Sequence, residues 1–304
     1  MTVSPDHYAG FLQRIGHRVR NVDGMWWFNT SRGVYTCIPS DLDLDPTAVP
    51  VRQVLGRDGV VARFGCPVHQ GVSSFRLICD DPGYHVDQLR GWTRTQVRRG
   101  LELCRTEQVP FDVLAKQAIP LNADTLIRQG RRVPVNLENY WQTYFAEAAK
   151  TEGAEAWGSF VDGELAAYLI SFTINDVANI VIMRSAIAHL KKFPNNALLY
   201  QFLYERVRDS GLTHVGIGYA SMQAGLESLD QFKLRMGFRM APVGQRVEMA
   251  SWLKPFVNQL TAGPACQLLR RFTDSETAGK FEGMLKWYHE QPDLRIRHAE
   301  VRAA

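Results

Sequence analysis

The sequence has no long hydrophobic run. Its 304 residues are 45% hydrophobic and 22% charged, and no apolar stretch approaches the roughly 20 residues that a membrane-spanning helix needs. The polar start, Met1-Thr-Val-Ser-Pro-Asp-His, also lacks the apolar centre of a signal peptide. We therefore expect a cytosolic protein with no membrane span.

Cysteines are few and their spacing does not suit metal or redox chemistry. No two of the five lie in a C-x-x-C pair, which is the usual spacing of a zinc site or a redox couple. Cys66-Pro-Val-His69 offers only two ligands, too few for a closed metal site. The sequence predicts no bound metal and reduced, structural thiols at Cys37, Cys66, Cys79, Cys104 and Cys266.

The sequence also lacks a strong charge bias, a short repeat and a low-complexity segment. Its formal net charge is +4, which permits an anionic ligand without requiring a nucleic acid. The length suits one large domain or two of about 150 residues each.

The first hundred residues show the pattern of short strands separated by turns. Segments 24–28 and 34–38 flank Asn29-Thr-Ser-Arg-Gly33, which predicts a hairpin. Further strands are expected at 60–64 and 75–79.

A helical period follows over 84–107, with Val97, Leu101 and Cys104 on one face. Two interpretations of its arginines stay open. Arg94 and Arg98 could hold an anionic substrate or the acceptor end of a tRNA, because phosphate contacts need only cations within reach. They could equally form a solvated helix face. The helix carries Arg90, Arg94, Arg98, Arg99 and Arg105.

The second half alternates helices and strands in the order α-β-β-β-α-β-α-β. This order predicts a mixed α/β sheet with helices on both faces. A domain boundary is expected at 131–136, where Val133-Pro-Val interrupts the pattern. We predict domains at 1–133 and 134–250 and a helical extension at 251–304. The expected elements are helix 137–151, strands 157–161, 165–172 and 178–185, helix 195–210, strand 215–218, helix 226–236 and strand 238–249.

Four segments of this half resemble the GNAT-like acyltransferase fold. They also resemble, more narrowly, Fem-type aminoacyl transferases and their acyl-CoA-using relatives. The resemblance implies a tandem fold in which 1–133 is a degenerate first copy. The segments are 163–170, 194–200, 211–218 and Phe232-Lys-Leu-Arg-Met-Gly-Phe238.

The resemblance implies a place for the acyl donor. In this fold two central strands part, a pantetheine arm lies along the open edge, and the next helix offers its N-terminal amides to the pyrophosphate. The glycine loop of acetyl-CoA users is absent here, since no glycine lies between Arg184 and Gly211. The donor thus stays open between acyl-CoA, an acyl carrier protein and aminoacyl-tRNA, with no tightly bound cofactor. The expected donor-binding residues are Lys191, Lys192, Asn195, Asn196 and Ala197.

The resemblance also indicates candidate catalytic residues. Tyr219 follows the short strand 215–218, where these folds place the proton donor to the leaving thiolate, although it could equally be an aromatic that closes the core. Ser221 is a weaker candidate for the same role. Lys233 could neutralise a phosphate or a developing oxyanion, or be a solvated helix charge. Arg184 could bind a substrate carboxylate or be an ordinary surface arginine.

Together these observations predict an N-acyltransferase that moves an acyl group from a thioester to a small-molecule or peptide amine by direct attack. One alternative is an aminoacyl-tRNA-dependent transferase that forms an amide or peptide bond. Another is a binding module that keeps the fold without the chemistry, because no general base is evident.

Overall fold

The computed structural model describes residues 3–220, 227–257 and 275–294. The chain divides into two compact units that interleave along the sequence. Unit one comprises Met1–Gly16, Leu77–Gly218 and Gln231–Met240, and unit two comprises His17–Arg76, Tyr219–Asp230 and Ala241–Ala304. The sequence predicted contiguous domains instead, with boundaries near 133 and 250. The unit boundaries fall inside β5 (Val72–Cys79), β10 (His214–Tyr219), α8 (Glu227–Arg235) and β11 (Arg239–Met249).

Unit one is built on a sheet with the strand order β10-β9-β8-β7-β6. Its strands pair antiparallel except for β10 and β9, which run parallel. Strand β8 is buried from Leu165 to Phe172, as expected of a strand covered on both faces. The turn into β8 places Asp162 and Gly163 at positive φ, which is the backbone of a two-residue hairpin between two of the predicted strands. The strands are β6 (Arg105–Val109), β7 (Ala154–Val161), β8 (Glu164–Ile174) and β9 (Val177–Ser185).

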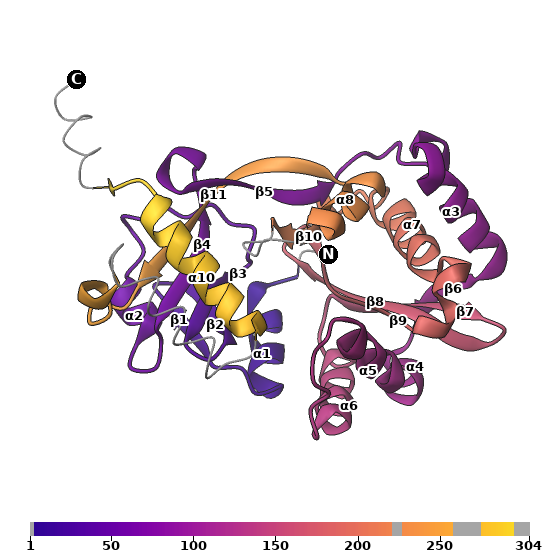
Figure 1. The fold of residues 1–304 in the computed structure, drawn as a ribbon, viewed down its shortest axis with the longest axis horizontal. Coiled ribbons are helices and arrows are strands. Elements are labelled where there is room, and N and C mark those ends of the chain that lie inside the picture. Colours follow the sequence, from indigo (N-terminus) through magenta and orange to yellow (C-terminus); the bar gives the residue numbers. More distant parts are fainter. Residues whose placement is uncertain (1–2, 221–226, 258–274, 295–304) are drawn as a thin grey trace. The chain divides into compact units, whose positions relative to one another are not determined.

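Helices cover both faces of this sheet (Figure 1). Helix α7 lies on one face with α3 against it, while α4, α5 and α6 lie on the other. Tyr144, Phe145 and Trp141 of α6 form a buried aromatic group. The bounds are α3 (Gly91–Leu103), α4 (Phe111–Gln117), α5 (Ile119–Arg128), α6 (Leu137–Ala148) and α7 (Pro194–Arg206), with short 3-10 turns at Val86–Gln88 and Ile187–Lys192.

The start of the chain packs on unit one, which the sequence pattern did not predict. Helix α1 (Pro5–Arg14) is capped by the Ser4 hydroxyl, which accepts from the Asp6 amide at 3.2 Å. The ring of Phe11 lies 4.7 Å from that of Phe172 and 5.0 Å from that of Tyr144. This apolar contact ties the first helix to strands far away in the sequence.

The helix predicted over 84–107 is shorter and buries a different face. It ends at Leu103, because residues from Arg105 onward form β6 and pair with β7. Leu101 is exposed, whereas Gly100 is buried. A Cβ at Gly100 would lie 2.8 Å from the Phe193 carbonyl oxygen, so the missing side chain lets α3 approach the start of α7.

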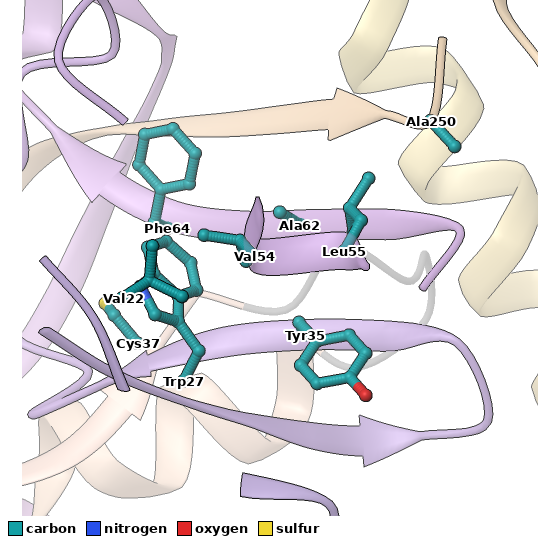
Figure 2. Packing of buried hydrophobic residues seen from close by; sticks show 9 residues of the cluster. All are labelled: Val22, Trp27, Tyr35, Cys37, Val54, Leu55, Ala62, Phe64 and Ala250. Atoms are coloured by element: carbon teal, nitrogen blue, oxygen red, sulfur yellow. The ribbon is translucent and has the colours of Figure 1, made fainter. Parts of the chain in front are cut away.

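Unit two contains the strands β1-β2-β3-β4-β11-β5 in that order. The predicted hairpin is confirmed as β2 and β3, which pair antiparallel, and β3 then pairs parallel with β4. Figure 2 shows the core around Trp27, Tyr35 and Phe64, where the Trp27 and Phe64 rings meet edge to face at 5.8 Å. The bounds are β1 (Val19–Val22), β2 (Met25–Ser31), β3 (Val34–Ile38), α2 (Val51–Leu55) and β4 (Val61–Cys66), with a 3-10 turn at Val68–Gln70.

Part of the predicted helical extension is present in unit two. Helix α10 (Ser275–Glu290) follows a 3-10 turn at Lys254–Phe256. Met284 and Leu285 of this helix pack on Val247 of β11 in a second apolar cluster. Residues 258–274 and 295–304 of the predicted extension lie outside the described residues. Of the helices described, none has the length and apolar character needed to cross a membrane, and the cytosolic location stays a prediction.

Candidate functional site

Strands β9 and β10 of unit one part after a short parallel pairing. The paired residues are His214 with Val177, Val215 with Ala178, and Gly216 with Asn179. Beyond Asn179, β9 continues to Ser185 with β8 as its partner. Among the described residues no strand pairs with the other edge of β9 there, so its backbone groups are available for pairing with an extended ligand. This is the parted sheet expected from the resemblance.

A β-bulge lies directly after the point of parting. Ile170 of β8 pairs with Ile182 and Ser171 pairs with Ile180, so Val181 is an extra residue in β9. A bulge bends its strand and increases the local twist, which accounts for the divergence from β10. The Val181 side chain is 38% exposed in the middle of the sheet, so the protein does not cover β9 fully at this point.

The predicted donor-binding residues gather at the start of α7, but several are already engaged. The Asn196 and Ala197 amides both donate to the Phe193 carbonyl, at 3.1 and 3.2 Å. The Ala197 side chain lies in the contact with Gly100 of α3. Asn196 is buried and its amide group contacts the Met236 sulfur at 3.7 Å. Fewer amides thus face outward than an open helix start would offer.

The other donor-binding candidates lie on the 3-10 turn and on the first turn of α7. The Lys192 ammonium pairs with Asp162 at 2.9 Å, while Lys191 is exposed. The Asn195 side-chain amide donates to the Ser185 hydroxyl at 2.9 Å. Phe193, which precedes the helix, has φ 57°, and a bulky residue rarely adopts this left-handed conformation.

Tyr219 belongs to unit two, where its hydroxyl donates to the Ser40 carbonyl. Burial raises its pKa above the ordinary 10.0, so the phenol stays protonated at neutral pH. The Arg63 guanidinium lies 5.6 Å from the Tyr219 ring and 5.6 Å from the Trp287 ring, while Gln245 accepts its Nε hydrogen at 2.9 Å. Sequence reasoning missed Arg63. Nothing in the sequence indicated that Arg63 would lie between the rings of Tyr219 and Trp287.

The segment Phe232–Phe238 has a clear structural role in unit one. The Tyr84 hydroxyl donates to the Met236 carbonyl at 2.7 Å, and Gly237 ends α8 at φ 103°. A Cβ at Gly237 would overlap the Tyr84 ring, so glycine is required there. Lys233 is half-buried on α8, and its carbonyl accepts from the Phe238 amide at 3.2 Å. Ser221 lies outside the described residues.

Arg184 lies near the end of β9, opposite Tyr168 of β8. Burial lowers the pKa of Arg184, and the charges of Arg131 and Arg128 lower it further. Its guanidinium donates to the Met183 carbonyl at 3.1 Å. The next residue, Ser185, accepts hydrogen bonds from Asn195 at 2.9 Å and from Arg128 at 3.4 Å. The structure thus brings Asn195 and Arg128 together at Ser185, the residue after Arg184, and neither Arg128 nor Ser185 was predicted.

The predicted basic helix is partly neutralised. Arg98 of α3 pairs with the Asp87 carboxylate at 2.5 Å, and Arg94 lies 3.5 Å from the Asp87 carbonyl. Arg99 pairs with Glu102 at 3.4 Å. These exposed pairs favour the solvated-face interpretation of the helix.

Sequence comparison gives no match, whereas structure comparison finds proteins of the same fold. No family model matches the sequence, and no curated protein matches it. FemX superposes with a TM-score of 0.57 at 11% identity, covering 86% of this chain and 93% of FemX. The C-terminal DUF2156 domain of a protein described as a lysylphosphatidylglycerol synthetase, from Agrobacterium fabrum, gives a TM-score of 0.53 at 12% identity, covering 82% and 89%. A tandem GNAT protein from the clavulanic acid biosynthesis pathway also matches, with a TM-score of 0.42 at 11% identity, covering 74% and 78%.

These findings establish the fold class. The chain shares its fold with FemX and with the DUF2156 domain, a mixed sheet flanked by helices, which agrees with the Fem-like fold that the resemblance implied. At 11–12% identity the likeness concerns the fold alone.

Proposed function

We propose that the protein is an N-acyltransferase whose acyl donor lies along the open edge of β9. The observation that carries the proposal is the parting of β9 and β10 after Asn179 and Gly216, together with the bulge at Val181. A strand edge with unpaired amides and carbonyls can bind an extended, amide-containing arm as an added strand. The fold class supports the same assignment.

The reaction that we propose is direct aminolysis. The neutral amine of the acceptor attacks the acyl carbonyl carbon, so a C–N bond forms and the C–S bond of the donor breaks. The departing thiolate takes a proton from an acid of the protein, and the proton lost by the amine restores that acid. Tyr219 and Lys233 remain the proposed proton donor and charge-stabilising residue, and Arg94 and Arg98 remain proposed substrate contacts.

A second candidate is an aminoacyl-tRNA-dependent transferase, in which a C–O ester bond breaks instead. The observation that favours it is the start of α7, where the Asn196 and Ala197 amides already bond to Phe193 and α3 packs closely. A CoA pyrophosphate gains least from amides that are already satisfied. The likeness to FemX agrees with this candidate.

The test is to fill the opening beside β9. Val181→Trp places a large ring at a position that is 38% exposed, and the matched control Val68→Trp changes a residue of unit two that is 43% exposed. We expect Val181→Trp to weaken donor binding about tenfold or more, a loss of about 1.4 kcal/mol, and Val68→Trp to leave it unchanged. Equal binding by both variants would remove the β9 edge as the donor site.

Calorimetry identifies the donor. If the donor is a thioester, acetyl-CoA and longer acyl-CoAs should bind. If an aminoacyl-tRNA binds instead, and RNase abolishes this binding, the result supports the second candidate. Binding of either donor without amide formation on any amine tested would point to a module that keeps the fold without the chemistry.

A further inference from the structure

The loop that joins α5 to α6 in unit one exposes apolar side chains. Val133 and Val135 are 42% and 107% exposed, and Ile127, in the last turn of α5, is 59% exposed. Burial of an aliphatic side chain is favourable, so a loop that holds three of them in water presents a surface suited to a second body. Helices α5 and α6 lie on the same face of the unit-one sheet (Figure 1), and the loop runs from the end of α5 to the start of α6.

A second segment adds to this surface. The Ile187 amide, at the start of a 3-10 turn, donates to the Asp124 carboxylate of α5 at 3.1 Å. Residues four apart lie on one face of a helix, and Arg128, four residues after Asp124, donates to the Ser185 hydroxyl at 3.4 Å. These two bonds place Ile187, which is 45% exposed, beside the end of α5. The exposed apolar side chains thus come from two segments that are far apart in the sequence.

The same surface is basic. Segment 125–137 contains three arginines and no acidic residue, and all three arginines are exposed. Lys191, on the 3-10 turn that contacts α5, is exposed as well. Like charges repel one another, and an anionic partner would relieve that repulsion. We define the α5–α6 surface by the residues Ile127, Arg128, Arg131, Arg132, Val133, Val135 and Ile187.

The combination of cations and aliphatic side chains selects among anionic partners. A nucleic acid binds through phosphate contacts and through base stacking on aromatic rings, and the apolar members of the α5–α6 surface are all aliphatic. An acidic protein would need a complementary shape, whereas Val135, at 107% exposure, protrudes from the protein. An anionic bilayer accepts protruding aliphatic side chains at its headgroup boundary and attracts the cations around them. The surface therefore fits a lipid bilayer best.

We propose that the α5–α6 surface docks unit one on an anionic lipid bilayer. Its arginines lie at the level of the lipid phosphates, and Val133 and Val135 enter the boundary between the headgroups and the acyl chains. The contact is peripheral and places no helix across the bilayer. The docking is independent of acyl transfer, since no residue of the surface takes part in the proposed reaction.

Vesicle binding tests the proposal. The full chain is sedimented with vesicles of phosphatidylcholine alone and with vesicles in which about a third of the lipid is phosphatidylglycerol. We expect binding to the anionic vesicles and little binding to the neutral ones. Val133→Ser with Val135→Ser removes the apolar part, and Arg131→Gln with Arg132→Gln removes two charges. Each double variant should weaken binding about tenfold or more, and because all four residues are exposed, both variants should fold.

Matched control variants carry the same changes elsewhere. Arg99→Gln with Arg105→Gln lowers the net charge of unit one equally, at exposed arginines that already form ion pairs. Val68→Ser with Met240→Ser replaces two apolar residues that are 43% and 53% exposed. Both controls should bind anionic vesicles nearly as the wild type does.

Salt and a fluorescent label separate attraction from insertion. Raising the ionic strength screens the arginines, so it should weaken binding of the wild type and abolish binding of the double valine variant, which keeps only its charges. A polarity-sensitive dye on Val135→Cys reports insertion. The label is attached in a Cys266→Ser background, because the four other cysteines are buried. Its emission should shift to the blue with anionic vesicles, and the same dye on Val68→Cys should not shift.

Three outcomes would overturn the proposal. The wild type could fail to sediment with anionic vesicles, or the two double variants of the α5–α6 surface could bind them as well as the controls do. The third outcome is binding of RNA, or self-association, that the same variants abolish while no vesicle binds, which would assign the surface to a different partner.

Discussion

Replacing Tyr219 by phenylalanine separates the structural role of its hydroxyl from the proposed catalytic one. In unit two the hydroxyl donates to the Ser40 carbonyl. The variant keeps the ring that faces Arg63 at 5.6 Å, so packing and the cation–π contact remain. The loss is one neutral hydrogen bond and one carbonyl left without its donor.

The expected cost in stability is about 1 kcal/mol, because water reaches a half-buried residue and replaces part of the lost bond. Denaturant unfolding measures this free energy. The matched variant Tyr35→Phe loses a hydrogen bond to the charged Asp58, at 2.7 Å in the same unit, and should cost about 1.5–3 kcal/mol.

The effect on turnover is independent of that cost. A proton donor to the leaving group contributes about 10²–10⁴-fold to the rate. When turnover is measured well below the unfolding temperature of the variant, Tyr219→Phe should therefore lower kcat by at least about 100-fold. The Tyr35→Phe control should retain activity. Because burial raises the pKa of Tyr219 above 10.0, Tyr219 should add no ionisation to the pH profile below pH 10. Unchanged turnover in Tyr219→Phe would refute the catalytic assignment, and unchanged stability would refute the reasoning from the Ser40 bond.

Three further predictions concern stability and thiol chemistry. Burial alone would raise the pKa of Asp58, but hydrogen bonds from Arg18 and Tyr35 and the charge of Arg20 outweigh it and lower the pKa to about 2. The stabilisation that Asp58 provides is therefore present above pH 3.8 and is lost as the pH falls toward 2. Asp58→Asn should lower the unfolding free energy by about 1–2 kcal/mol at pH 7 in urea unfolding. If the unfolding free energy of the variant fell between pH 3.8 and 2 as steeply as that of the wild type, this reasoning would be wrong. Gly237→Ala should lower the unfolding free energy by about 1–3 kcal/mol in calorimetry, because the new methyl group meets the Tyr84 ring at positive φ, whereas Gly163→Ala, with open space at its Cβ position, should cost less. Burial raises the pKa of the Cys37, Cys66 and Cys79 thiols to about 12. Alkylation of these thiols in the folded protein at pH 8, mapped by mass spectrometry, should therefore be slow. Rapid labelling of any of them would refute the packing described.

The sequence predicted the strands and helices of the second half well, because their apolar patterns are strong and local. The turn Asp162-Gly163 and the run 165–172 identify a hairpin with a buried second strand, and the structure has both. The parting of β9 and β10 came from the family resemblance, since strand splay depends on a bulge. Nothing in the residues around Val181 signals that bulge.

What the sequence could not predict depends on contacts between distant segments. Helix α1 owes its place to Phe172 and Tyr144, and β6 forms because β7 offers an edge to residues 105–109. The candidate site shows the same division. Arg184 could be named from its position near a strand end, whereas Arg128 becomes relevant only because α5 ends beside Ser185.

The way in which the two units share the chain restricts how the protein can be cut. Residues 219–230 of unit two separate two segments of unit one, and β5, β10 and β11 each contribute to both units. No single cleavage yields one whole unit, and an expressed fragment covering 134–250 would lack α3, α4 and α5 and much of unit two. Domain-dissection experiments should therefore use paired fragments or circular permutants that keep each unit complete.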